Sequence, residues 1–256
     1  MEAISAERVV LTPGAGTDIL GGVDLKVEEG EFIAIVGPSG CGKTTFLNAV
    51  AGLTAITGGV LSVRGESPRA GRPDTGFALA RDSLLPWRSA IGNVELALQV
   101  RRVAKAKHRR LAEEALKRVG LESALDRHPA ALSQGMRQRV ALARTFVTSP
   151  TLLLMDEPFG ALDTQTRVMM QDLLLSMLNA FGGTLLFITH DLAEAIVLAD
   201  RVVLFSNRPA RVEAEYAVDI GRPRNIEDAR NDAHFAALYN EMWTRLKHEL
   251  DAESAY

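Results

Sequence analysis

The chain has 256 residues, of which 47% are hydrophobic and 24% are charged. This is the composition of an ordinary soluble globular protein with ample apolar material for a core, and the length fits one large domain or one domain with a smaller lobe. The 29 basic residues nearly balance the 32 acidic ones. A polyanion-binding surface therefore has no electrostatic support, and we expect no nucleic-acid partner.

Cys41 is the only cysteine, which excludes an intrachain disulfide and fits a reducing cytosol. The first ten residues, MEAISAERVV, lack a basic segment followed by an apolar one, so we expect no signal peptide. No uninterrupted apolar run approaches the roughly 18 to 20 residues that a membrane helix needs. We therefore expect a chain that does not cross a bilayer by itself, although it can dock on a protein that does.

The first third of the chain predicts strands and turns. Segment 19–27 alternates loosely, and 32–36 (FIAIV) is a short apolar run typical of a strand buried on both faces of a parallel sheet. A glycine-rich loop follows, and then 44–51 has the apolar spacing of a helix that ends at Gly52. The order strand, loop, helix is the setting that a phosphate-binding loop requires.

Helical spacing dominates 88–147, where the apolar segments 94–100 and 111–119 are separated by a basic run at 101–110. We interpret that run as a solvated helix face or a linker. Two more buried-strand runs follow, at 151–155 and 184–189, and each ends in polar residues. Three further helices are predicted at 167–178, at 192–199 and, as an amphipathic helix, in the C-terminal tail.

The glycine-rich loop reads GPSGCGKTT and matches the P-loop pattern completely. Its backbone N–H groups can wrap a phosphate, and the helix start adds the positive end of a dipole. We expect Lys43 to reach the β- and γ-phosphates of ATP and the Thr44 hydroxyl to hold Mg²⁺. The predicted nucleotide contacts in this loop are Gly37, Pro38, Ser39, Gly40, Cys41, Gly42, Lys43, Thr44 and Thr45.

Two carboxylates follow the strand at 151–155. Ligands gather at the carboxyl ends of the strands in open α/β sheets, so Asp156 is placed to organise Mg²⁺. Glu157 beside it is placed to act as general base toward an attacking water. Alone this pair is a weak signal, but together with the P-loop it predicts phosphoryl transfer from ATP to water.

Residues 132–139 (LSQGMRQR) resemble the signature motif of the ATP-binding cassette (ABC) ATPases, whose usual form is LSGGQ. Gln134 and Met136 depart from that form. In this family the signature lies at a helix N-terminus and contacts the γ-phosphate held by the P-loop of a second subunit. The resemblance therefore implies a homodimer with Ser133, Gln134 and Gly135 as nucleotide contacts.

Residues 160–163 (GALD) resemble the D-loop of the same family, which adds Asp163 to the expected contacts, and His190 resembles its switch histidine. With Glu157 and Lys43, His190 completes the expected catalytic set. The motifs occur in family order over about 5–205. They imply an α/β P-loop NTPase fold with a RecA-like core, an N-terminal antiparallel β subdomain and an inserted α-helical subdomain.

The resemblance also implies the domain limits. The chain would be a single nucleotide-binding domain over 1–256, with its core at about 1–87 and 148–220. The helical subdomain would cover about 88–147 and a C-terminal helical tail about 225–256.

Within the family, residues 84–88 (LLPWR) resemble a segment of the importers for nitrate, sulfonates and taurine. This similarity implies contact with membrane permease subunits near Leu84, Pro86 and Trp87, and an indirect link to a substrate-binding protein. It also implies a peripheral position on the cytoplasmic face of the plasma (inner) membrane. The solute stays open among nitrate, sulfonates, and small aromatic or pyrimidine compounds.

Two residues that the family normally has are missing. Ala80 stands where a glutamine usually contacts Mg²⁺ and the attacking water, and segment 12–17 (TPGAGT) lacks the aromatic ring that stacks on adenine. Base stacking is worth roughly 1–3 kcal/mol, so ATP binding would weaken by roughly 5- to 150-fold. We expect a slow or weakly binding ATPase whose turnover in the assembled transporter rises with Ala80→Gln.

Two other functions stay open, and a third, a P-loop kinase or GTPase, does not explain residues 132–136. An ABC ATPase that acts on ribosomes or DNA usually has two cassettes in one chain or long coiled coils, and this chain has neither. A weakly hydrolysing or non-hydrolysing regulatory ATPase is compatible with Ala80 and with the missing aromatic ring.

Overall fold

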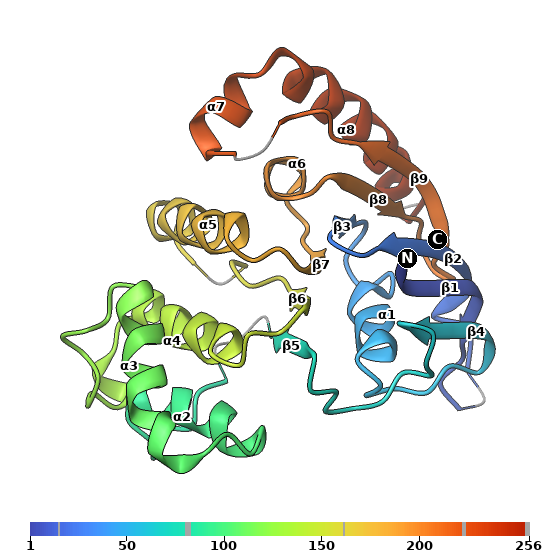
Figure 1. Cartoon of the computed structure of the whole chain (residues 1–256). Helices are drawn as coiled ribbons and strands as arrows, with labels where there is room; N and C mark the ends of the chain where they lie inside the picture. The colour runs from blue at the N-terminus through green and yellow to red at the C-terminus, as the bar shows by residue number, and fades with distance from the viewer. Residues whose placement is uncertain (15, 80–82, 161, 222–223, 254–256) are drawn as a thin grey trace.

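The computed structural model describes residues 1–14, 16–79, 83–160, 162–221 and 224–253. Its strands form a three-stranded sheet, with the order β2-β1-β4, and a six-stranded sheet, with the order β5-β6-β7-β3-β8-β9 (Figure 1). The strands are β1 Glu2–Leu11, β2 Leu20–Glu28, β3 Phe32–Val36, β4 Gly58–Val63, β5 Thr75–Ala78, β6 Leu152–Asp156, β7 Thr184–Ile188, β8 Arg201–Phe205 and β9 Val212–Ala217.

The large sheet is parallel from β5 to β8, and β9 joins its edge antiparallel to β8. Every residue of β3, β6 and β7 is buried. This confirms the strands predicted from the three apolar runs, because strands covered on both faces read as continuous apolar sequence. The last residues of these strands, Val36, Asp156 and Ile188, therefore lie along one edge of the sheet.

Alternate residues of β3 contribute to two different cores. Ile33 and Ile35 pack with α1 and with the apolar faces of the small antiparallel sheet. Phe32 and Ala34 pack on the other side with α5, α6 and α8. The period-two alternation of a strand thus divides the molecule into layers. The helices are α1 Lys43–Val50, α2 Ala90–Val100, α3 His108–Arg118, α4 Gln134–Phe146, α5 Thr164–Asn179, α6 Leu192–Leu198, α7 Ile226–Asn231 and α8 Ala233–Glu253.

Helices α2, α3 and α4 form a body of their own beside β5 and β6 (Figure 1). They share a separate apolar cluster that includes Ile91, Val94, Leu116 and Val140. Short 3₁₀ turns at Lys105–Lys107 and Pro129–Ala131 lie between them. Among the helices that the structure describes, none combines the length and the apolar character needed to span a membrane.

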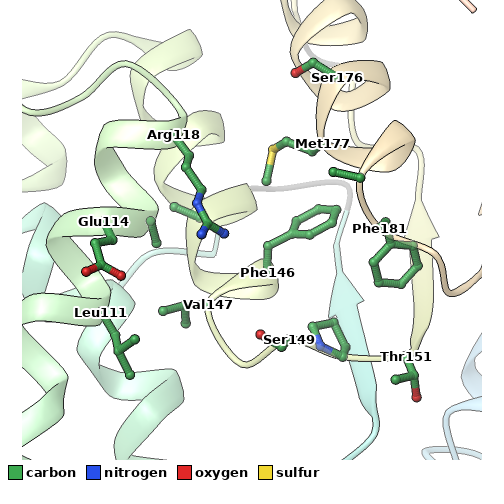
Figure 2. Close-up of a pocket in the computed structure, with 14 residues that line it drawn as sticks. Leu111, Glu114, Arg118, Phe146, Val147, Ser149, Thr151, Ser176, Met177 and Phe181 are labelled. Carbon is green, nitrogen blue, oxygen red and sulfur yellow. The ribbon is translucent and has the colours of Figure 1, made fainter. Parts of the chain in front are cut away.

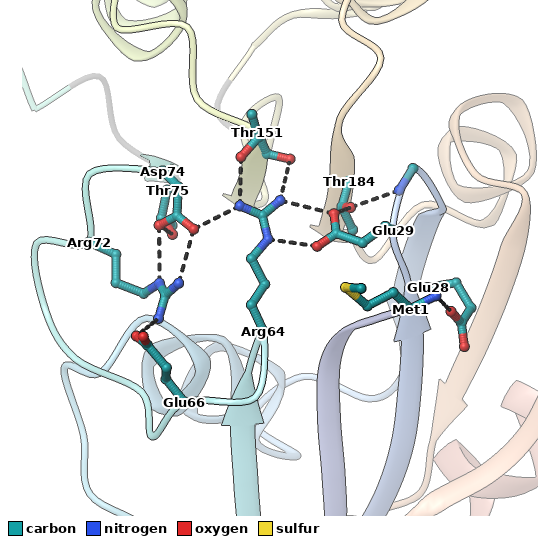
Figure 3. A network of polar contacts seen from close by, with 11 residues as sticks. Met1, Glu28, Glu29, Arg64, Glu66, Arg72, Asp74, Thr75, Thr151 and Thr184 are labelled. Carbon is teal, nitrogen blue, oxygen red and sulfur yellow. Dashed lines mark hydrogen bonds and ion pairs between the residues drawn. The ribbon is translucent and has the colours of Figure 1, made fainter.

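Arg64, just after β4, fastens the small sheet to the large one (Figure 3). Its guanidinium donates to both carboxylate oxygens of Glu29, at 2.7 and 2.9 Å, and to Asp74 and Thr151 at 2.7 Å each. Partial burial acts to raise the pKa of Asp74, but hydrogen bonds from Arg72 and Arg64 outweigh it and lower this pKa to about 2. The ionised form of Asp74 therefore stabilises the folded chain through its contacts with Arg64 and Arg72.

Candidate nucleotide-binding and catalytic site

The glycine-rich loop connects β3 to α1 at the carboxyl edge of the large sheet. At Gly37 a Cβ would lie 2.7 Å from the backbone oxygen of Phe205, so the loop passes too close to β8 for any side chain. At Gly42 the φ angle is 127°, and a Cβ would lie 2.9 Å from Cγ2 of Ile19. Both glycines are thus required by space or by backbone conformation.

Lys43 is buried, and its Nζ donates to the carbonyl oxygens of Gly37 and Pro38 at 2.8 Å each. The ammonium group therefore lies inside the loop, where a phosphate oxygen can replace a carbonyl as its partner. Within the described part of the chain, no side chain caps the start of α1. Its first N–H groups are the kind of donor that binds a phosphate at a helix N-terminus.

Thr44 and Asp156 meet across the end of β6. The Thr44 hydroxyl donates to Oδ1 of Asp156 at 3.0 Å. Burial raises the pKa of Asp156, and the nearby charge of Glu157 raises it further, while the Thr44 hydrogen bond and Lys43 act in the opposite direction. A hydroxyl and a carboxylate side by side are hard oxygen ligands, so these residues fit the Mg²⁺ that such sites use. A bound cation would also stabilise the charged form of Asp156, which burial disfavours.

Glu157 follows Asp156 in a strained conformation, with a φ angle of 42°. Its N–H donates to the carbonyl oxygen of Ile188 at 2.9 Å, which fixes the backbone against β7. Its Oε2 lies 3.3 Å from Nδ1 of His190, the predicted switch histidine. Strained backbone at a non-glycine residue is typical of functional sites. The structure thus pairs the two groups for which we predicted catalytic roles.

The residues on either side of His190, Thr189 and Asp191, are fixed by hydrogen bonds. The N–H of Asp191 donates to the Thr189 hydroxyl, which in turn donates to Oε2 of Glu194 at 2.6 Å. Gln171 donates to the other oxygen of Glu194 at 2.7 Å. Burial raises the pKa of Glu194. The sequence did not point to Glu194 or Gln171, because a polar residue inside a helix carries no local signal of burial.

The signature segment begins α4. The Ser133 hydroxyl accepts a hydrogen bond from the N–H of Met136 at 3.3 Å, and Ser133 and Gln134 are exposed. Gly135 lies so close to α5 that a Cβ would be 2.8 Å from Cγ2 of Thr166. Gln138, one turn further along α4, donates to the carbonyl oxygen of Pro158 at 2.6 Å. The signature helix is therefore attached to the segment that carries Glu157 in the same chain.

Asp163 begins α5 and accepts a hydrogen bond from the N–H of Thr166 at 3.0 Å. Backbone and side-chain hydrogen bonds from Thr166 lower the pKa of Asp163. The predicted D-loop residue thus also has a local role as the helix cap. Ala80, where we expected the loss of a catalytic glutamine, and Ala161 of the D-loop lie outside the described residues.

The structure brings five of the predicted residues to one edge of the sheet, namely Lys43, Thr44, Asp156, Glu157 and His190. The signature residues are not part of this group. Figure 1 shows α4 and α1 on opposite sides of β6. A signature contact with the phosphate end of ATP within one chain would therefore need a large rearrangement.

Polar contacts of Thr12 link the end of β1 to the residues before β2 and before β4. The Thr12 hydroxyl donates to Oδ1 of Asp18 at 2.6 Å, and its N–H donates to the Thr57 hydroxyl at 3.0 Å. Ile19, the residue before β2, has its side chain against Gly42. The apolar side chain of Ile19 is thus positioned beside the P-loop, in a region where the sequence showed no aromatic ring.

A cavity of about 720 Å³ lies away from these residues (Figure 2). Phe146, Met177 and Phe181 line one side of it, and Leu111 and Arg118 of α3 line the other. It also reaches Thr151, which precedes β6, whereas Asp156 ends that strand. The cavity and the nucleotide site therefore lie at opposite ends of β6.

The chain is similar to several known proteins over most of its length. The family described as ABC transporter matches residues 20–160. An ATP-binding protein of Brucella abortus (strain 2308) is 42% identical over 96% of this chain and 94% of its own length. The ATP-binding cassette MJ0796 has been solved as a dimer in a post-hydrolysis state with ADP and Pi. That structure is 31% identical, with a TM-score of 0.75, over 85% of this chain and 100% of that one.

Two transport proteins of Synechococcus elongatus are also similar. The bicarbonate transport ATP-binding protein CmpC is 41% identical over 87% of this chain, and the nitrate import ATP-binding protein NrtC is 39% identical over 94% of it. The matched regions are 34% and 37% of those proteins, so this chain spans about a third of their length. From its motifs, fold and relatives, the chain belongs to the ABC transporter family and is an ATP-binding subunit with the ATPase activity of that family.

Proposed function

We propose that this chain is the ATP-hydrolysing subunit of an importer for a small anion. The observation that carries the proposal is the arrangement at the sheet edge. A buried Lys43 lies inside the P-loop, Thr44 is hydrogen-bonded to Asp156, and Glu157 faces His190 at 3.3 Å. The names of the relatives CmpC and NrtC support bicarbonate or nitrate as the solute class, and the sulfonate group of compounds such as taurine carries the same single negative charge.

In the proposed mechanism, Thr44 and Asp156 would hold Mg²⁺, which when bound would supply positive charge toward the phosphates. Lys43 exchanges one of its two carbonyl partners for a γ-phosphate oxygen. The water oxygen bonds to the γ-phosphorus as the bond from that phosphorus to the β-phosphate oxygen breaks, so ADP and phosphate are released. The Glu157 carboxylate takes the proton of that water, and His190 orients the carboxylate through Nδ1. The backbone of Glu157 is strained and hydrogen-bonded to the end of β7, and this would restrict the orientation of the Glu157 side chain.

We further propose that the complete site forms between two copies of the chain. The exposed Ser133, together with Gln134 and Gly135 at the start of α4, would contact the γ-phosphate held by the partner, and Asp163 would lie at the same interface. The helix start supplies N–H donors suited to an anion. The dimeric MJ0796 structures support this arrangement.

The permease contact is proposed at the turn near Leu84, Pro86 and Trp87. Trp87 is 71% exposed, which is unusual for the largest apolar side chain and fits an interface anchor. The helical body α2–α4 would move as an inserted subdomain, and residues beyond about 225 would form a tail on the core. The subunit would then sit peripherally on the cytoplasmic face of the inner membrane, and a substrate-binding protein would act only through the permease.

The test of this function is solute uptake in cells that carry Lys43→Ala in the native gene. We expect the variant to lose ATP-dependent uptake of labelled nitrate, bicarbonate or taurine, because Lys43 is the buried cation of the phosphate loop. A plasmid copy of the wild-type gene should restore it. Unchanged uptake of all three solutes would reject the small-anion importer.

A weakly hydrolysing regulatory ATPase is the second candidate, favoured by the polar Thr12–Asp18 contact where an adenine-stacking ring would be expected. Single-turnover release of phosphate from bound ATP separates the two functions. The importer requires release that depends on Glu157, whereas the regulatory ATPase would release phosphate slowly or not at all over the lifetime of the complex.

A further inference from the structure

The exposed Trp87 lies on a tight, ordered turn. The N–H of Arg88 donates to the carbonyl oxygen of Leu85 at 3.1 Å, which closes a four-residue turn with Pro86 in its second position. Proline is favoured there because its φ angle is already that of the turn. Leu84, on the near side, packs against the apolar cluster of α2, α3 and α4. The turn thus presents Trp87 outward on a fixed base.

Asn93 in α2 holds this turn from behind. Its side chain is fully buried, and its Oδ1 accepts a hydrogen bond from the N–H of Leu85 at 2.7 Å. Its Nδ2 donates to the carbonyl oxygens of Leu85, Arg88 and Ser89 at 3.2, 3.1 and 3.0 Å. The amide of Asn93 thereby binds both the N–H and the carbonyl group of Leu85, at the start of the turn. It also binds Arg88, the last residue of the turn, and so links both ends of the turn to α2. An apolar residue at 93 would deprive the Leu85 N–H and the Arg88 carbonyl oxygen of this partner, whereas the Leu85 and Ser89 carbonyl oxygens would keep the backbone N–H groups of Arg88 and residue 93.

The start of α2 is also attached to the loop that leads to the signature. The N–H groups of Ala90 and Ile91 donate to the carbonyl oxygens of Arg127 and Leu125 at 2.8 and 2.9 Å. These are two of the N–H groups that a helix start leaves unpaired, and the loop binds them in addition to the Ser89 side chain, which caps the N–H of Gly92. The start of α2, which follows the Trp87 turn, is therefore hydrogen-bonded to the segment that precedes Ser133.

We propose that Asn93 is a positioning residue that fixes the Trp87 turn for docking on the permease and joins it to the signature segment. The inference rests on the proposed importer function, because it needs a membrane partner at Trp87. An anchor held in its bound geometry loses little conformational freedom on association, so the hydrogen bonds of Asn93 contribute to affinity without touching the partner.

The first readout needs no partner. In a Trp243→Phe background Trp87 is the only tryptophan, since the chain has two. We expect Asn93→Leu to lower the fluorescence anisotropy of Trp87, and Asn93→Asp to do the same, since aspartate keeps the acceptor for Leu85 but loses both N–H donors. Val94→Ala is the matched control, because Val94 is the next residue of α2 and faces the apolar cluster instead. It should leave the anisotropy unchanged.

The second readout is rebinding to inside-out membranes of the source cells, stripped of peripheral proteins with urea. Protein-free liposomes of the extracted lipids serve as the comparison. Wild type should bind the stripped membranes saturably and the liposomes not at all. Asn93→Leu should weaken that binding about tenfold, with Trp87→Ala also weakened and Val94→Ala unaffected. The membrane-stimulated ATPase rate per bound subunit should fall in Asn93→Leu.

The outcomes separate the two claims. If Trp87→Ala loses binding while both Asn93 variants match Val94→Ala in anisotropy and affinity, the role of Asn93 is overturned and the permease contact stands. If wild type binds stripped membranes no better than liposomes, the proposed docking is wrong and the role of Asn93 falls with it. Lower anisotropy together with weaker binding, in either Asn93 variant that folds, supports the proposal.

Discussion

At the scale of single residues, two glycines of the P-loop have different reasons to be glycine. A Cβ at Gly37 would strike the backbone of Phe205 at 2.7 Å, whereas Gly40 has a φ of 74° and open space around it. We therefore expect Gly37→Ala to lower the free energy of unfolding by about 3 kcal/mol, and Gly40→Ala by about 1 kcal/mol. Urea denaturation of both variants measures the difference. Equal losses would show that β8 yields to the extra methyl group.

Asp74 provides a pH prediction. Its folded pKa of about 2 lies below the ordinary 3.8, so its ionised form stabilises the fold above about pH 4 and this contribution is lost as the pH falls toward 2. The stability gap between wild type and Asp74→Asn should therefore shrink by about 2 kcal/mol across that window. Urea unfolding at a series of pH values tests this. A gap that stays constant with pH would mean that Arg64 and Arg72 do not hold the Asp74 charge.

The residues that could be predicted are those whose chemistry is local in the sequence. Lys43 and Thr44 belong to a motif, and Asp156 and His190 directly follow buried runs, so their common location follows from sheet topology. Asn93 and Gln138 could not be predicted, because their partners depend on how helices pack. The one available signal is position: Asn93 lies on the apolar side of α2, between Ile91 and Val94.

At the scale of elements, the close contact between α4 and α5 gives a further prediction. Gly135→Ala would bring a methyl group 2.8 Å from Cγ2 of Thr166, at the start of both helices. We expect a loss of about 1–3 kcal/mol in stability. Thr166→Ser removes that methyl and keeps the hydroxyl, so the double variant should recover most of the loss. Thermal unfolding of the four proteins of this cycle tests it, and additive losses would contradict a direct contact.

The same scale shows which elements the sequence could specify. Strands β3, β6 and β7 are buried on both faces and read as apolar runs, so they were predicted. Strand β5 has only four residues, and β9 alternates exposed positions with two partly buried ones and the buried Tyr216. Neither was predicted individually, because short or edge strands are defined by their partners in the sheet rather than by their own composition.

At the scale of the whole molecule, the proposed composite site requires one chain to carry two halves of an ATP site in different parts of its surface. The phosphate end, with Lys43, Asp156 and Glu157, lies at the sheet edge, and the exposed Ser133 begins a helix on the other side of β6. Gln138 and Pro158 connect the two halves within the chain. In a dimer that completes both sites, this connection would run from one nucleotide to the other.

ATP-dependent dimerisation of Glu157→Gln is the most direct test of this composite site. Glutamine keeps the shape of the side chain but cannot accept the proton of the attacking water, so ATP should stay bound and hold two chains together. In sedimentation velocity with Mg²⁺ and ATP, we expect Glu157→Gln to form a dimer that dissociates when ATP is removed, and Lys43→Ala to stay monomeric. A Glu157→Gln protein that remains monomeric, or that hydrolyses ATP at the wild-type rate, would contradict the assignment of Glu157 as the base of a site shared between two subunits.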